Sequence, residues 1–153
     1  MRITKTLSIA MAFIGMAATT QAQEIHMNDQ KKEILATIER MTTAFAKGDI
    51  DTIMSTYAPN AVVVGEPGKQ LSGDTALRTM FASYVEAGIP FTYGAHEVVV
   101  SGDTALHLMK WTAPQPDGSK ASALSVAVLH RQPDGRWKMV IDHPFGDAVM
   151  ESR

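Results

Sequence analysis

Two ionisable side chains, Glu66 and His107, have the chemistry of a general acid or base. Glu66 lies in the turn-forming sequence Gly65–Gly68, and a glutamate accepts a proton readily when partial burial raises its pKa towards neutrality. His107 lies in the apolar run Thr104–Trp111, where an imidazole inside a cavity can act as a base or bind a ligand. The structural alternatives are an exposed turn carboxylate and a core histidine with its hydrogen bonds made.

Asp142 and His143 are a carboxylate and an imidazole in adjacent positions near the end of the chain. Neighbours in a strand point to opposite faces, so both line one pocket only if Pro144 bends the chain there. The alternation places His143 on the side of Trp137 and Met139, which predicts that His143 is the inward residue of the pair. A hydrogen-bonded pair at a strand end is the structural alternative.

Large side chains with a polar tip suit the binding of an apolar ligand, although core packing also accounts for them. The sequence holds three tyrosines and a tryptophan of this kind, and the Asp142 carboxylate is a further candidate for ligand binding. The catalytic candidates are Glu66, His107 and His143. The ligand-binding candidates are Tyr57, Tyr84, Tyr93, Trp111 and Asp142.

Several kinds of site are not expected from the residue types present. The chain has no cysteine, which excludes disulfides, thiolate catalysis and thiolate metal sites. Its five histidines show no HxxxH or similar spacing, no GxSxG sequence surrounds a serine, and no glycine-rich phosphate loop is present. We therefore predict neither a metal nor a cofactor.

The N-terminus has the pattern of a cleaved signal peptide. Arg2 and Lys5 form a short basic region, the apolar run Leu7–Ala18 is too short to span a bilayer, and Thr20-Gln21-Ala22 offers small residues at a cleavage site. We predict a signal peptide over residues 1–22 and one domain over residues 23–153, in the periplasm or secreted. An uncleaved anchor is the alternative.

The charge of the predicted mature chain argues against polyanionic partners. Residues 23–153 carry twelve basic and sixteen acidic residues, a net charge of −4, and no segment clusters lysine and arginine. We expect binding neither to nucleic acid nor to a membrane surface after signal cleavage. A chain of this length is sufficient for one domain with its own core.

Apolar periodicity predicts a long first helix. Ile34, Ile38, Met41 and Phe45 fall on one helical face, which predicts a helix from Asn28 or Asp29 to Lys47 after a frayed lead-in over residues 23–27.

A short second helix and a third helix are expected next. Asp49 can cap the second, whose apolar spacing extends to Tyr57, and the β-branched sequence 61–64 predicts a strand after it. Ser72 or Asp74 can cap the third helix, which ends at Gly88.

The second half of the chain predicts strands alone. Short turns rich in glycine, aspartate and proline separate them, so we expect antiparallel hairpins, followed by a tail over residues 145–153. The predicted strands are Phe91–Val100, Thr104–Ala113, Lys120–Arg131 and Trp137–Pro144.

Two of these strands are apolar on both faces, at Val98–Val100 and Ala123–Leu129. One face must cover the helices, and a monomer rarely leaves the other in water. We therefore expect a homodimer through the outer face of the sheet.

The order of elements and several motifs resemble the NTF2-like superfamily, most closely its SnoaL-like/DUF4440 branch. The matching residues are Ala46–Asp51 leading to Tyr57–Ala61, Ser72–Leu77 at the third helix, and Trp137–His143. The resemblance implies an α+β cone in which three N-terminal helices pack on a curved antiparallel sheet. Ketosteroid isomerase, polyketide cyclases and scytalone dehydratase share that fold, which implies no single activity.

The resemblance to ketosteroid isomerase can be examined residue by residue. It would place a catalytic base at Glu66 before Pro67, and two oxyanion donors near Met41 and Ala127. Neither of the last two side chains donates a hydrogen bond, which argues against that activity.

The sequence therefore predicts an exported domain whose apolar pocket binds a small hydrophobic molecule. If the domain is an enzyme, the candidates fit a cofactor-free isomerisation, dehydration or cyclisation with Glu66 or His107 as base. The alternative is a non-catalytic binding module or dimeric assembly module with a vestigial pocket.

Overall fold

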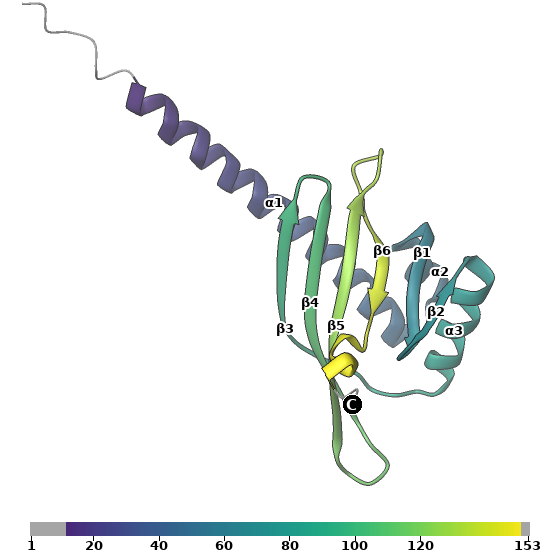
Figure 1. Cartoon of the computed structure of the whole chain (residues 1–153). Helices are drawn as coiled ribbons and strands as arrows, with labels where there is room; N and C mark the ends of the chain where they lie inside the picture. Colours follow the sequence, from purple (N-terminus) through teal and green to yellow (C-terminus); the bar gives the residue numbers. More distant parts are fainter. Residues whose placement is uncertain (1–11, 151–153) are drawn as a thin grey trace, which may run out of the picture.

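Six strands form one curved, mixed sheet in the computed structural model, which describes residues 12–150 (Figure 1). Their order across the sheet is β2-β1-β6-β5-β4-β3. The strands are β1 (Tyr57–Glu66), β2 (Lys69–Ser72), β3 (Thr92–Ser101), β4 (Thr104–Pro114), β5 (Lys120–Arg131) and β6 (Trp137–His143). The helices are α1 (Ala12–Lys47), α2 (Ile50–Ser55), α3 (Asp74–Glu86) and the short 3-10 helix η1 (Gly146–Met150).

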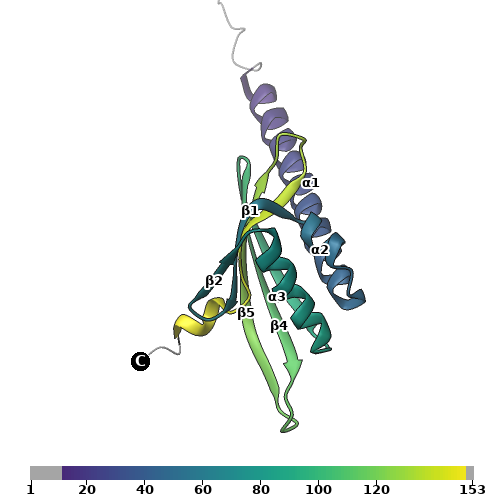
Figure 2. The same cartoon turned by 90° about the vertical axis from the view of Figure 1, so that its right-hand side faces the viewer.

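The three α-helices lie on one face of the sheet, which we call the inner face, and η1 lies on the opposite, outer face (Figure 2). The core between the α-helices and the inner face is strongly apolar. Ile34, Ile53, Leu129 and Met139 have no exposed surface at all. Burial of such side chains supplies the main favourable term in folding.

The last four strands form three antiparallel hairpins, which confirms the prediction from turn composition. The observed bounds differ from the predicted ones by no more than one residue. Gly102 and Gly135 have φ angles of 58° and 83° in two of the turns, a region that glycine enters without steric cost.

The prediction of an entirely antiparallel sheet is wrong at one pair of strands. β1 pairs with β6 in parallel, with Val62 opposite Ile141 and Val63 opposite Asp142. No turn connects these two strands, because β6 ends the run of hairpins and β1 arrives from α2. The composition of turns therefore carries no information about their relative direction.

The second helix is shorter than predicted, and the first strand is longer. The Asp49 carboxylate accepts the backbone N–H of Thr52 at 3.0 Å, which confirms Asp49 as the cap of α2. The Thr56 hydroxyl donates to the Ile53 carbonyl at 2.6 Å where the helix ends. The apolar spacing had predicted that the helix extends to Tyr57. In the structure Tyr57 is instead the first residue of β1.

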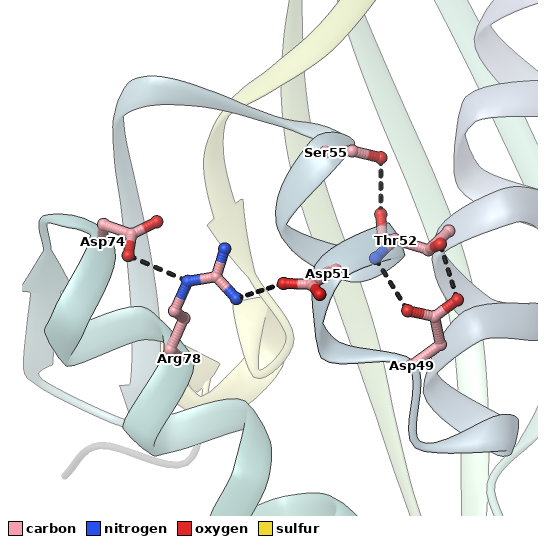
Figure 3. A network of polar contacts seen from close by, with 6 residues as sticks. All are labelled: Asp49, Asp51, Thr52, Ser55, Asp74 and Arg78. Atoms are coloured by element: carbon pink, nitrogen blue, oxygen red, sulfur yellow. Dashed lines mark hydrogen bonds and ion pairs between the residues drawn. The ribbon is translucent and has the colours of Figure 1, made fainter.

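An ion-pair network joins α2 to α3 (Figure 3). The Arg78 guanidinium donates to Asp74 at 2.8 Å within α3 and to Asp51 of α2 at 2.6 Å. These side chains are largely exposed, so the network orients the two helices and adds little stability. The cap of α3 is Gly73 without a side-chain bond, and neither Ser72 nor Asp74 as predicted.

The first helix begins earlier than predicted. α1 starts at Ala12 and continues through the predicted cleavage site at residues 22–23, so residues 23–27 are helical and not a frayed lead-in. Residues 28–47 of that helix match the predicted segment. The rest of the predicted signal peptide, residues 1–11, lies outside the described residues. Within residues 12–150 no helix is both long and apolar enough to cross a membrane.

Removing part of the fully buried core should destabilise the fold strongly. We expect Leu129→Ala to lower the free energy of unfolding by about 2–5 kcal/mol, because the lost side chain leaves a cavity between sheet and helices. Urea unfolding followed by circular dichroism measures the change. Ser83→Ala, at an exposed position of α3, is the control and should stay within about 0.5 kcal/mol of the wild type. Equal unfolding midpoints for the two variants would contradict the described core.

Candidate functional site

A cavity of about 720 Å³ lies between the inner face of the sheet and the helices. Its walls come from α1, α3, the linker before β3, the strands β1, β3, β4, β5 and β6, the turn between β4 and β5, and the segment after β6. Most of the lining side chains are apolar or aromatic. A cavity of this size and composition can enclose a small organic molecule.

Four aromatic rings form one continuous wall of the cavity. The wall is a row of rings in the order Phe45, Phe91, Trp111 and Phe145. The centroids of neighbouring rings in this row are 5.8, 5.3 and 5.9 Å apart, and their planes are close to perpendicular. The Trp111 indole N–H donates to the carbonyl of Pro144 at 2.6 Å. Edge-to-face packing and this hydrogen bond hold the wall in place.

The polar part of the cavity is a buried pair, Tyr57 and Asp142. The Tyr57 hydroxyl donates to Asp142 Oδ2 at 2.6 Å, and the two residues are only 3% and 5% exposed. Burial raises the pKa of Asp142 from 3.8 to about 6, although the Tyr57 hydrogen bond and the proximity of His143 oppose that rise. Burial, followed by the neighbouring carboxylate, raises the pKa of Tyr57 well above its ordinary value.

A β-bulge in β6 decides which member of the Asp142–His143 pair faces the cavity. Leu129 of β5 pairs with Met139, but Val128 pairs with Ile141, so β6 contains one extra residue at this point. The bulge shifts the alternation, and Asp142 becomes the inward residue while Ile141 is 47% exposed. The prediction that His143 points inward is therefore wrong. Its Nδ1 instead accepts the backbone N–H of Phe145 at 3.2 Å.

Two further tyrosines reach the same cavity. Tyr93 is 37% exposed, and burial together with the charge of Asp142 raises its pKa to about 12. The Tyr84 hydroxyl donates to the carbonyl of Gly65. Burial, and then the charge of Glu66, raises the pKa of Tyr84. All five ligand-binding candidates thus line one cavity, and their contact with a ligand stays a prediction.

The structure does not bring the three catalytic candidates into this cavity. Glu66 is exposed in the β1–β2 hairpin, where its carboxylate forms an ion pair with Lys69 at 2.6 Å. His107 is 1% exposed, and its ring centroid is 5.8 Å from that of His96. Burial, and then His96, lowers the pKa of His107 to about 4, so this imidazole is neutral at pH 7. His143 faces away for the reason given above.

Two polar residues of the cavity, Ser125 and Gln115, were missed in the sequence. Ser125 is 7% exposed and lines the cavity from β5. Its signal was present, since it shares the inward side of that strand with Ala127 and Leu129. Residues 12–150 contain no group of three His, Cys, Asp or Glu side chains that could hold a metal ion.

Comparisons with known proteins identify relatives by sequence model and by structure. The sequence model of the SnoaL-like domain matches residues 38–140. No curated protein matches the chain significantly.

Solved structures share the fold at low sequence identity. An NTF2-like protein of unknown function from Pseudomonas putida is 22% identical, with a TM-score of 0.67 over 76% of this chain and 85% of its own. A protein from Shewanella frigidimarina, with ketosteroid isomerase as its proposed activity, is 21% identical, with a TM-score of 0.64 over 71% and 90%. An NTF2-like protein from Streptomyces avermitilis, with dehydratase as its proposed activity, is 24% identical, with a TM-score of 0.61 over 76% and 95%.

The buried carboxylate of the cavity should leave a signature in the pH dependence of stability. The pKa of Asp142 is higher in the folded chain than in the unfolded one, so its contribution to stability is fully present below about pH 4. We expect the wild type to lose about 2 kcal/mol relative to Asp142→Asn as the pH rises from about 4 to about 7. Urea unfolding of both proteins between pH 4 and 7 measures this difference, in which other titrating groups cancel. A difference that does not change with pH would disprove the assignment.

Proposed function

Because this chain belongs to the SnoaL-like family of the NTF2-like superfamily, we propose that it is an exported domain that binds a small hydrophobic molecule in the cavity beneath its helices. The observation that carries the proposal is the cavity itself, with an aromatic wall and one buried polar pair. Export rests on the predicted signal peptide over residues 1–22, which places the domain in the periplasm or outside the cell.

The cavity has the chemistry expected of a site for an apolar ligand. Its volume of about 720 Å³ exceeds what the neighbouring core leaves unfilled by packing alone, since interiors hold few voids larger than a water molecule. The polar groups are few and gathered near Asp142, so they would orient a ligand while the walls contribute most of the buried area.

A second candidate function is cofactor-free proton transfer, and one observation favours it. The Asp142 carboxyl lies inside an apolar cavity with its pKa raised to about 6, which suits a general base or acid near neutral pH. In this candidate Asp142 takes the role that the sequence analysis gave to Glu66 or His107. The isomerase and dehydratase activities proposed for two structural neighbours belong to those proteins, which share the fold alone.

Filling the cavity should weaken the binding of an apolar probe. We expect the wild type to bind the neutral fluorescent probe N-phenyl-1-naphthylamine and Ala121→Trp to bind it at least about tenfold more weakly, since Ala121 lines the cavity. Ser122→Trp adds the same ring on the opposite face of β5 and is the matched control. Fluorescence titration measures both affinities. Equal binding by the two variants, or none by the wild type, would refute the proposed site.

We also propose that two copies of the chain associate through the outer face. Val99, Leu106, Val128 and Ile141 pair in register across β3, β4, β5 and β6, which makes a continuous apolar row. Val99 is 51% and Ile141 is 47% exposed, so the row is open to water in the single chain.

Light scattering at micromolar concentration tests this interface. We expect the mass of a dimer for the wild type and of a monomer for Ile141→Lys, because the lysine would bury a charge in the apolar row. Ser83→Lys, on the exposed side of α3, should leave the dimer intact. A monomeric wild type would exclude the interface.

A further inference from the structure

The hydrogen-bonding capacity around Asp142 is unevenly distributed. The single proton of the Tyr57 hydroxyl is donated to Oδ2 at 2.6 Å. The other oxygen, Oδ1, accepts no hydrogen bond from the residues that the structure describes. Oδ1 also keeps some accessible surface, because the fully enclosed side-chain atoms without a partner among the described residues belong to His107 and Trp137, and Asp142 lines the cavity. The carboxylate therefore offers an open acceptor to whatever enters the cavity.

The other polar side chains of the lining do not offset the open acceptor of Asp142 with a free donor-only group. The Trp111 N–H is engaged by the carbonyl of Pro144, and the Tyr84 hydroxyl is engaged by the carbonyl of Gly65. Tyr93 and Ser125 bring hydroxyls and Gln115 brings an amide, and each of these groups can both donate and accept, so none selects one kind of ligand. Among the described residues that line the cavity, Asp142 is the one whose ionised side chain can only accept hydrogen bonds.

The charge of the lining also favours a ligand that donates a hydrogen bond. Among the described residues that line the cavity there is no lysine, arginine or histidine, so the Asp142 carboxylate has no cationic partner inside it. A buried carboxylate is costly unless donors satisfy its oxygens. Tyr57 satisfies one oxygen, and a donor on the ligand would satisfy the other.

We propose that the cavity selects apolar molecules whose buried end donates a hydrogen bond to Asp142, through a hydroxyl or an ammonium group. Molecules of the same shape that only accept hydrogen bonds, such as ethers and ketones, bind less well, because their oxygen would face the carboxylate. This inference rests on the proposed binding function and adds the chemical class of the ligand to it.

A matched pair of probes tests the selection. We expect the wild type at pH 8 to bind 2-naphthol about tenfold more tightly than 2-methoxynaphthalene, the ratio that one hydrogen bond to a charged group supports. Isothermal titration calorimetry measures both affinities. A third probe, 2-naphthylmethylamine, distinguishes an ammonium from a hydroxyl donor, and tighter binding of either donor than of the ether supports the proposal.

The substitution Asp142→Asn should remove the preference for the hydroxyl probe over the ether. The amide oxygen can accept the Tyr57 hydroxyl as Oδ2 does, which turns the NH₂ group towards the cavity as a donor. The variant should then bind 2-methoxynaphthalene at least as tightly as 2-naphthol. Asp103→Asn, at an exposed turn, makes the same change outside the cavity and should keep the preference of the wild type.

The outcomes separate this inference from the proposed function. If the wild type binds neither 2-naphthol nor 2-naphthylmethylamine more tightly than 2-methoxynaphthalene, or if Asp142→Asn keeps the preference of the wild type, the donor selection is overturned while apolar binding stays intact. If neither the naphthalene probes nor N-phenyl-1-naphthylamine bind, the binding function fails and the selection fails with it.

Discussion

The hydrogen bond from Tyr57 to Asp142 is the contact on which the site depends. It joins the first residue of β1, which follows the helical corner, to the penultimate residue of β6, 85 positions later in the chain. Both residues are buried, so loss of either partner would leave the other with a costly unsatisfied polar group. The carboxylate can occupy an apolar cavity because the phenol satisfies one of its oxygens there. The rest of the cavity is arranged around this pair.

Much of the fold was predictable because its signals are local. The hairpins of the second half are marked by their turns, the apolar stripe marks α1, and Asp49 marks the start of α2. The parallel pairing of β1 with β6 was not predictable in this way, since it joins segments that no turn connects. The bulge at Val140 was also hidden, because the sequence around it is compatible with an unbroken strand.

The large aromatic residues of the candidate site could be predicted from the sequence, whereas its ionisable residues were predicted less well. The aromatic candidates came together because large side chains with a polar tip fill a concave space in any arrangement of these strands. The ionisable candidates depended on orientation. One extra residue in β6 makes Asp142, and not His143, the residue that faces the cavity. Glu66 lies at the tip of a hairpin and is exposed. His107 follows the strand alternation, but it lies deeper along β4 than Met109, where the core is closed.

The position of the cavity follows from the sizes of the inward side chains along β5. Leu129 is fully buried in the core, and the inward positions that precede it are Ala127, Ser125, Ala123 and Ala121. These small residues leave space beneath the helices towards the N-terminal end of β5, where Ser125 and Ala121 line the cavity. The larger rings of the neighbouring β4 and of the linker, at Trp111 and Phe91, line that space without closing it. The same strand therefore stabilises the fold at one end and shapes the binding site at the other, so the two properties can vary independently along it.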